Sequence, residues 1–279
     1  MREQRTYPPG VPCWVETLQP DPRAGLAFYQ ALFGWDGIGP GPMPDGGEYF
    51  VARLHGHEVA GIATLPPGGV AEPAWTTYVR VEVLEDSTRR VRTAGGRVIV
   101  EPLDASPAGR LAIVASPAGA TIGLWEPASR SGAQRINEPG AWAMSTLRTR
   151  DVHAATPFYS SVFGWNSQPY HMGGMQAALL RLPGYVGGRE QQPVPRDVVA
   201  VAIEDDRIDA DHWSVDFWID DVDAAAARVT QHGGTLVVPP FDMAIFRRAV
   251  IASPAGAVFT LSQLVSERLA SLGARSAAP

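Results

Sequence analysis

The chain has 279 residues, 45% of them hydrophobic, with a net charge of −6 and one cysteine, Cys13. No apolar run approaches the roughly 18 residues of a membrane helix, and the polar start MREQRTYPPG lacks the apolar stretch of a secretion signal. A lone cysteine fits a reducing cytoplasm, where we place the protein, and the acidic charge argues against nucleic-acid and membrane partners.

The first elements alternate in type. Residues 11–19, VPCWVETLQ, alternate in polarity and predict a strand. A helix follows, in which Asp21 serves as the N-cap, Pro22 takes the first turn and Gly34 ends the last turn. Residues 47–65 predict two further strands around a turn at His55-Gly56-His57. The next predicted elements are a strand at 75–83, a helix at 84–96, and strands at 96–102, 109–117 and 120–127.

The second half repeats the phrases of the first half in the same order. The repeated pairs are FYQALFGW (28–35) and FYSSVFGW (158–165), RTAGGRVIVEP (92–102) and TQHGGTLVVPP (230–240), and ASPAGATIGLWEP (115–127) and ASPAGAVFTLSQL (252–264). The second copy is longer in the middle, which we assign to a Gly- and Pro-rich loop at 185–197. We therefore predict a first module at 1–130, a linker at 131–140, a second module at 141–265 and a tail at 266–279.

Each half repeats internally as well, because strand–helix–three strands occurs twice in it. The chain thus contains four βαβββ units, and the sequence leaves open whether they pair within or across the halves. In FYxxxFGW the aromatic residues share one side of the helix, and we interpret them as core rather than as a cofactor-binding motif. We expect each copy to repeat the phrase because each copy buries its own helix on its own sheet.

These phrases resemble those of the vicinal oxygen chelate superfamily, which includes glyoxalase I, extradiol dioxygenases, and fosfomycin and bleomycin resistance proteins. The opening PCWVETLQPDPRAGLAFYQALFGW is more narrowly similar to a two-module actinobacterial type. The resemblance implies an α+β fold, in which tandem glyoxalase-like modules form curved mixed sheets around two cups. In metal-dependent members a divalent metal sits in the cup, bound by His, Glu or Gln side chains.

The residues at the positions that the resemblance assigns to metal ligands do not suit a metal. These positions hold Trp14, Thr76 and Gly123 in the first half and Met144, Ser214 and Thr260 in the second half. Tryptophan does not bind metals, and a thioether is too soft for Mg²⁺ or Mn²⁺. A register shift of two residues keeps the same strand face and would introduce Glu16 and His212, which lie in different halves. We therefore predict neither a metal nor another cofactor, and we do not expect metal-dependent catalysis.

Strand alternation instead places aromatic residues and methionine in the cups. The predicted ligand-binding residues are Trp14, Glu16, Tyr78, Arg80, Trp125, Trp142, Met144, His212, Asp216 and Trp218. Such a lining suits a flat apolar molecule oriented by a few polar groups. The alternative, which the sequence leaves equally open, is that the same aromatic residues fill the cups as core.

Three functions remain open. The first is a metal-independent binding protein for a planar, aromatic natural product, acting in antibiotic sequestration and self-resistance or beside a tailoring enzyme of polyketide biosynthesis. The second is an enzyme, either a glyoxalase-like or dioxygenase-like metalloenzyme or a metal-free enzyme with Glu16 or Asp216 as general base. The third is a non-catalytic interaction protein with vestigial cups. Because duplication builds both cups in one chain, a monomer suffices, and a dimer is the alternative.

Overall fold

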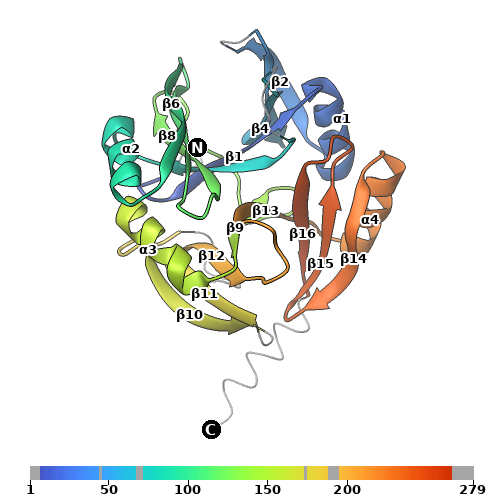
Figure 1. The fold of residues 1–279 in the computed structure, drawn as a ribbon. Helices are drawn as coiled ribbons and strands as arrows, with labels where there is room; N and C mark the ends of the chain where they lie inside the picture. Colours follow the sequence, from blue (N-terminus) through green and yellow to red (C-terminus); the bar gives the residue numbers. More distant parts are fainter. Residues whose placement is uncertain (1–6, 44–45, 67–71, 173–174, 188–194, 266–279) are drawn as a thin grey trace.

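The structure is a computed structural model that describes residues 7–43, 46–66, 72–172, 175–187 and 195–265. In these ranges, two eight-stranded mixed sheets carry four helices, and each sheet draws its strands from one half of the chain (Figure 1). None of the helices in these ranges is long and apolar enough to cross a membrane. The predicted α+β architecture of four βαβββ units is confirmed.

The elements follow the predicted order in both halves. The first half contains β1 (Pro12–Gln19), α1 (Pro22–Phe33), β2 (Asp36–Pro42), β3 (Glu48–Leu54), β4 (His57–Thr64), β5 (Trp75–Arg80), α2 (Leu84–Thr93), β6 (Arg97–Ala105), β7 (Gly109–Ala115) and β8 (Thr121–Pro127). The second half contains β9 (Trp142–Thr149), α3 (Val152–Phe163), β10 (Asn166–Met172), β11 (Met175–Arg181), β12 (Val198–Glu204), β13 (His212–Trp218), α4 (Val222–Gln231), β14 (Thr235–Met243), β15 (Phe246–Ala252) and β16 (Val258–Leu264).

Local chemistry explains the element boundaries. The Asp21 carboxylate accepts hydrogen bonds from the backbone N–H groups of Arg23 and Ala24 at the start of α1, and Gly34 ends the helix in the left-handed conformation, with φ 74°. The tight turn between β3 and β4 has positive φ at both His55 and Gly56. This is the backbone that a two-residue hairpin needs.

The units pair within each half, which settles the question that the sequence left open. The strand order is β2-β3-β4-β1-β5-β8-β7-β6 in the first sheet and β10-β11-β12-β9-β13-β16-β15-β14 in the second. At the centre of each sheet, the first strand of one unit runs antiparallel to the first strand of the other, β1 beside β5 and β9 beside β13. One cup in each half is therefore built from two units of the same half.

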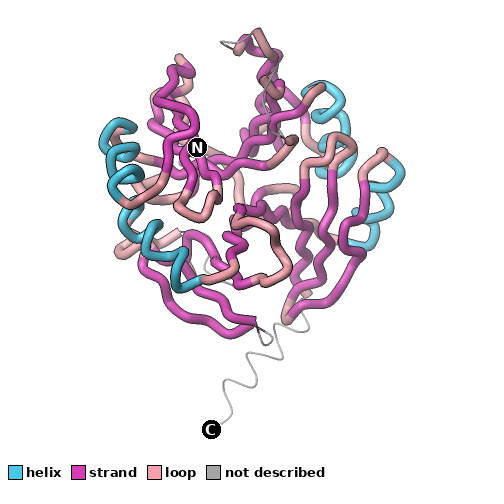
Figure 2. Tube along the Cα trace, in the orientation of Figure 1, coloured by secondary structure: helices cyan, strands magenta, loops and turns pink. Residues whose placement is uncertain are grey.

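The faces of the two sheets that point away from the cups meet between the halves. Thr77 on β5 and Ser145 on β9 share a buried hydrogen bond with 2.6 Å between their hydroxyl oxygens. Helices α2 and α3 lie together on one side of this junction and α1 and α4 on the other (Figures 1 and 2). Two hydrophobic clusters fill the junction, and each contains residues of both halves.

The repeated aromatic phrase packs across this junction, which corrects the expected reason for its repetition. Helix α1 does lie on its own strands β3 and β4. However, Phe33 lies with its ring centroid 5.0 Å from that of Phe217 in the other half. Trp35 donates a 2.7 Å hydrogen bond from Nε1 to the carbonyl of Gly140, and Trp165 reciprocates with a 2.6 Å bond to the carbonyl of Gly10. Each half thus supplies the phrase that anchors the start of the other.

The repeated glycine pair serves the same junction. A Cβ on Gly96 would come 2.6 Å from the ring of Phe158, and a Cβ on Gly234 would come 3.1 Å from the ring of Phe28. Contacts below 3.0 Å are sterically prohibitive, and a side chain at Gly96 would also meet the carbonyl of Ala115. The second glycine of each pair therefore leaves room for the first aromatic residue of the other half's phrase.

Because both clusters contain residues of both halves, we expect the protein to unfold in one transition rather than module by module. Trp35→Phe removes the donor to the buried Gly140 carbonyl and should lower the free energy of unfolding by about 1–3 kcal/mol. Urea denaturation followed by circular dichroism measures both the number of unfolding transitions and the free energy of unfolding. The exposed Ile38→Ala is the control, with an expected change within about 0.5 kcal/mol. Two separated transitions would contradict the shared core.

Candidate functional site

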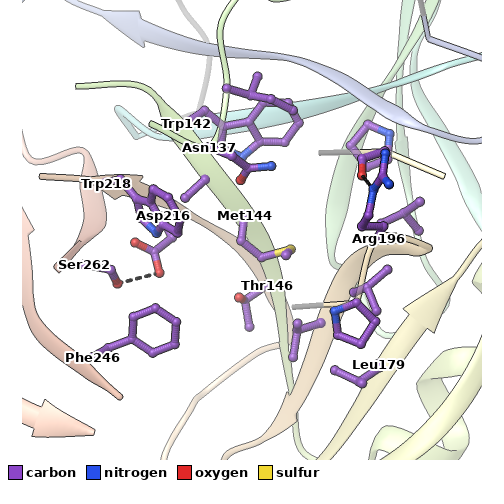
Figure 3. Close-up of a pocket in the computed structure, with 18 of the residues that line it drawn as sticks. Asn137, Trp142, Met144, Thr146, Leu179, Arg196, Asp216, Trp218, Phe246 and Ser262 are labelled. Atoms are coloured by element: carbon purple, nitrogen blue, oxygen red, sulfur yellow. Dashed lines mark hydrogen bonds between the residues drawn. The ribbon is translucent and has the colours of Figure 1, made fainter. Parts of the chain in front are cut away.

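The cup of the second half contains a cavity of about 460 Å³ (Figure 3). This volume lies within the range of small-molecule pockets, roughly 300–1,000 Å³. Most of its lining is apolar. The apolar lining residues are Val11, Pro12, Ile136, Trp142, Ala143, Met144, Leu179, Pro195, Val198, Val199, Val201, Ile203, Trp218, Met243, Ala244, Ile245 and Phe246. The cavity therefore offers extensive apolar surface with two indoles and two thioethers.

Besides the separate polar residues Asn137, Thr146 and Arg196, the lining contains one hydrogen-bonded polar cluster. Arg248 on β15 donates from Nη2 to Oδ2 of Asp216 on β13, at 2.5 Å, and from Nε to the hydroxyl of Ser262 on β16, at 3.0 Å. Ser262 in turn donates to the same Asp216 oxygen, at 2.9 Å. The other oxygen of Asp216, Oδ1, is buried and has no hydrogen-bond partner among the described residues.

Burial controls the electrostatics of this cluster. Asp216 is 8% exposed. Desolvation raises the pKa of its carboxyl, and the positive charge of Arg248 opposes this rise only in part. Desolvation and the neighbouring charge of Arg248 likewise lower the pKa of Arg148. The cavity thus holds a carboxyl group in an environment that disfavours its charge.

The cup of the first half is filled by its own side chains. The hydroxyl of Tyr78 donates to Oε1 of Glu16 at 2.9 Å, and Nε1 of Trp14 donates to the hydroxyl of Tyr49 at 3.2 Å. A Cβ on Gly123 would come 2.2 Å from the Tyr78 ring, so this position accepts only glycine. The ring of Tyr78 occupies the space beside this expected ligand position.

The segment after β8 closes the same cup. The guanidinium carbon of Arg130 lies 5.6 Å from the centroid of the Trp14 ring, and Arg130 is held by Glu58 through a 2.9 Å ion pair. The carbonyl of Arg130 accepts a 2.9 Å hydrogen bond from Nε1 of Trp125. The predicted linker residues 131–140 continue from this point, and Ile136 and Asn137 reach the cavity of the second half.

The predicted binding residues fall into three groups. Trp142, Met144, Asp216 and Trp218 line the cavity together, as strand alternation predicted for the cup face. The first cup buries Trp14, Glu16, Tyr78 and Trp125. For these four residues the structure agrees with the alternative that they fill the cup as core. Arg80 lies half-buried opposite Trp125. His212 is exposed at the start of β13, with Nδ1 3.1 Å from the Ala210 carbonyl. Neither of these two lines the cavity.

The residues that the sequence did not single out come mainly from β15 and from loops. Arg248 carries the only guanidinium bonded to Asp216 among the described residues. Alternation along 246–252 would have placed Arg248 on the same face as Phe246, since both line the cavity. Asn137 and Arg196 lie in connecting segments, where no periodicity indicates which way a side chain points.

The donor set does not fit a divalent metal in either cup. The described residues contain no group of three or more His, Cys, Asp or Glu side chains that could hold one ion. In the first cup Tyr78 covers Gly123, and in the second Asp216 is already bonded to Arg248. A metal-activated step therefore has no ligand set in the described part of the chain.

Glu16 gives the first cup a predicted pH dependence. Burial raises its pKa from the ordinary 4.5, despite hydrogen bonds from Tyr49 and Tyr78. A raised carboxyl pKa means that stability from this group is full below about pH 4.5 and is lost as pH rises through the raised value. Glu16→Gln removes this titration, so its melting temperature should rise relative to the wild type as pH increases. Thermal melts at a series of pH values from about 4.5 upward measure the melting temperatures of both proteins. The exposed Glu101→Gln is the control. A difference in melting temperature between Glu16→Gln and the wild type that stays constant with pH would contradict the prediction.

Comparisons with known proteins agree with this architecture. A model of the glyoxalase-like domain matches residues 143–262. "Putative glyoxylase CFP32" of Mycobacterium tuberculosis is 33% identical over 267 residues, which are 94% of this chain and 97% of the relative. "Anthracycline biosynthesis protein DnrV" of Streptomyces peucetius is 30% identical over 272 residues, 92% of this chain and 94% of the relative.

A solved structure shares the fold. The Mn(II)-bound glyoxalase from Novosphingobium aromaticivorans superposes with a TM-score of 0.61 at 16% identity, covering 91% of this chain and 82% of that one. This likeness concerns the fold alone. The family follows from the domain match and from the relatives at least 30% identical over nearly their whole length, and the shared fold agrees with it. The chain belongs to the glyoxalase-like proteins of the vicinal oxygen chelate superfamily.

Proposed function

We propose that the protein binds a planar, largely apolar aromatic molecule in the second cup, without a metal. The observation that carries this proposal is the cavity of about 460 Å³, lined by Trp142, Trp218, Met144 and Met243. Aromatic rings and thioethers offer polarizable surface for a flat ring system. The first cup has no such role in the proposal, because Tyr78, Tyr49 and Trp14 occupy it.

The similarity to an anthracycline biosynthesis protein supports an aromatic natural product as the ligand class. Anthracyclines are fused-ring compounds, and a fused ring system matches a mostly apolar cavity with a few polar groups. Two biological roles fit such binding. The protein would sequester an antibiotic in self-resistance, or it would present a biosynthetic intermediate to a tailoring enzyme of polyketide biosynthesis. Both roles require a cytoplasmic protein with a small aromatic ligand as its partner, and neither requires catalysis.

A metal-free enzyme is the second candidate, and the buried Asp216 carboxyl favours it. A raised pKa keeps this group poised to take a proton from a bound molecule, whereas Glu16, the other candidate base, faces a filled cup. Conversion of the bound compound by the wild type, but not by Asp216→Asn, would establish this role. Liquid chromatography with mass spectrometry of the ligand recovered after incubation makes the distinction, because it detects both a changed mass and an isomer of the same mass, and an unchanged retention time and mass with the wild type would leave binding as the function.

The first cup suggests the variant that tests the binding proposal. Met144 occupies the position that Trp14 holds in the filled cup, so Met144→Trp should fill the cavity and weaken ligand binding at least about tenfold. Met144→Leu keeps the volume and should retain binding. Titration of tryptophan fluorescence with a panel of planar fused-ring compounds gives both affinities, and melting temperatures confirm that each variant is folded. A saturable response that Met144→Trp leaves unchanged would place binding elsewhere.

A further inference from the structure

The second cup contains a polar cluster that the first cup lacks. The register of the two sheets makes Asp216, Arg248 and Ser262 equivalent to Tyr78, Leu111 and Trp125. In the first cup these positions are apolar or aromatic: Tyr78 and Trp125 belong to the buried core, and the partly buried Leu111 packs against it. The first half therefore serves as a comparison, because it shows which side chains occupy the equivalent backbone positions in a filled cup.

Stability does not explain the cluster. A buried ion pair loses the hydration of both charges, and replacing such a pair with packed apolar side chains is often neutral or stabilising. The first half shows that uncharged side chains suit these three positions, although Tyr78 there donates to the buried carboxylate of Glu16. A buried carboxyl and guanidinium beside a cavity are instead typical of a site that recognises a ligand.

The hydrogen bonds within the cluster determine what the ligand must supply. The Nε and Nη2 groups of Arg248 are committed to Ser262 and Asp216, and Nη1 lies 3.9 Å from Met243 Sδ. The hydroxyl of Ser262 is committed to Asp216 Oδ2. The unmet group is the acceptor Oδ1 of Asp216, which no described residue bonds. A buried acceptor without a donor is destabilising, so a donor from the ligand would be favoured.

From this geometry we infer, on the basis of the proposed function, that the ligand is a neutral hydroxyaromatic compound whose hydroxyl donates to Asp216. The ring system fills the apolar part of the cavity beside Met144 and Trp218 (Figure 3). Because the terminal torsion of aspartate is broad, a small rotation of the carboxyl brings Oδ1 to the cavity while Arg248 holds the group. A ligand carboxylate is disfavoured, since it would add a second negative charge beside Asp216.

A pair of pyrenes tests this inference. 1-Hydroxypyrene and 1-methoxypyrene share four fused rings, but only the first donates a hydrogen bond. We expect the wild type to bind 1-hydroxypyrene at least about tenfold more tightly than 1-methoxypyrene, because only 1-hydroxypyrene offers the Asp216 carboxylate a hydrogen-bond donor. Pyrene-1-carboxylate should bind more weakly than 1-hydroxypyrene. Fluorescence titration measures all three affinities.

Variants assign the preference to Asp216. The double variant Asp216→Leu/Arg248→Leu removes the ion pair without leaving an unpaired buried charge and should bind both neutral pyrenes equally. Asp216→Asn, which keeps the shape, should reduce the preference as well. Asp223→Asn is the matched control, since this exposed carboxylate pairs with Arg247 on the same strand as Arg248, and it should keep the wild-type preference.

The outcomes separate this inference from the proposed function. Equal wild-type affinities for the two neutral pyrenes would overturn the hydroxyl contact and leave the binding proposal standing. A preference that persists in the double variant would also overturn it. Failure of every pyrene to bind the folded wild type would overturn both. A preference that is lost in the double variant, reduced in Asp216→Asn and kept in Asp223→Asn supports the inference.

Discussion

The reciprocal anchoring of the two halves is the constraint on which the structure depends. Each half sends the tryptophan of its FGW phrase to a backbone carbonyl directly before the first strand of the other half, Trp35 to Gly140 and Trp165 to Gly10. These glycines are also held from their own halves, because Gly10 N–H bonds to the Arg80 carbonyl and Gly140 N–H bonds to the Trp218 carbonyl. The starts of β1 and β9 are thereby fixed at the centres of their sheets.

This arrangement explains why the two cups can differ while the backbone is shared. The faces that join the halves carry the repeated phrases, and substitutions there would act on both modules at once. Each cup face belongs to one sheet, so substitutions on it affect one module only. The first cup is packed by Trp14, Tyr49 and Tyr78, whereas the second cup keeps a cavity. A duplicated chain can therefore keep one module as support and leave the other open for a ligand.

The sequence predicted those features that depend on neighbouring residues. The N-cap of α1 at Asp21, the αL glycine at Gly34 and the hairpin at His55-Gly56 are each set by local chemistry, and the structure confirms them. The contacts of Phe28 with Gly234 and of Phe158 with Gly96 join residues from opposite halves. No periodicity in the sequence indicates such contacts. The pattern of the repeated phrase correctly predicts core residues, but the prediction that each phrase packs only on its own sheet is wrong.

The same limit applies to the site. Alternation correctly places Met144 and Asp216 on the cup face, because it needs only the period of a strand. Whether a cup is filled depends on longer-range pairings. Trp14 fills its cup because Tyr49 from β3 meets its indole and Arg130 covers it. Likewise Asp216 is part of a buried ion pair because β15 brings Arg248 beside it, and β16 adds the hydroxyl of Ser262.

The polar cluster of the second cup also constrains how the site can act. Arg248 and Ser262 both bond Oδ2 of Asp216 and hold the carboxyl at the cavity wall, so the small rotation that presents Oδ1 is the only adjustment that the proposed contact asks of it. The same burial that raises the pKa of Asp216 strengthens any hydrogen bond it accepts, since the local dielectric is low. Recognition and a capacity to take a proton thus arise from one physical cause. Under the proposed function, the acidity of the ligand's hydroxyl decides between the two, because a weakly acidic phenol would remain protonated and be held, whereas a more acidic one would transfer its proton.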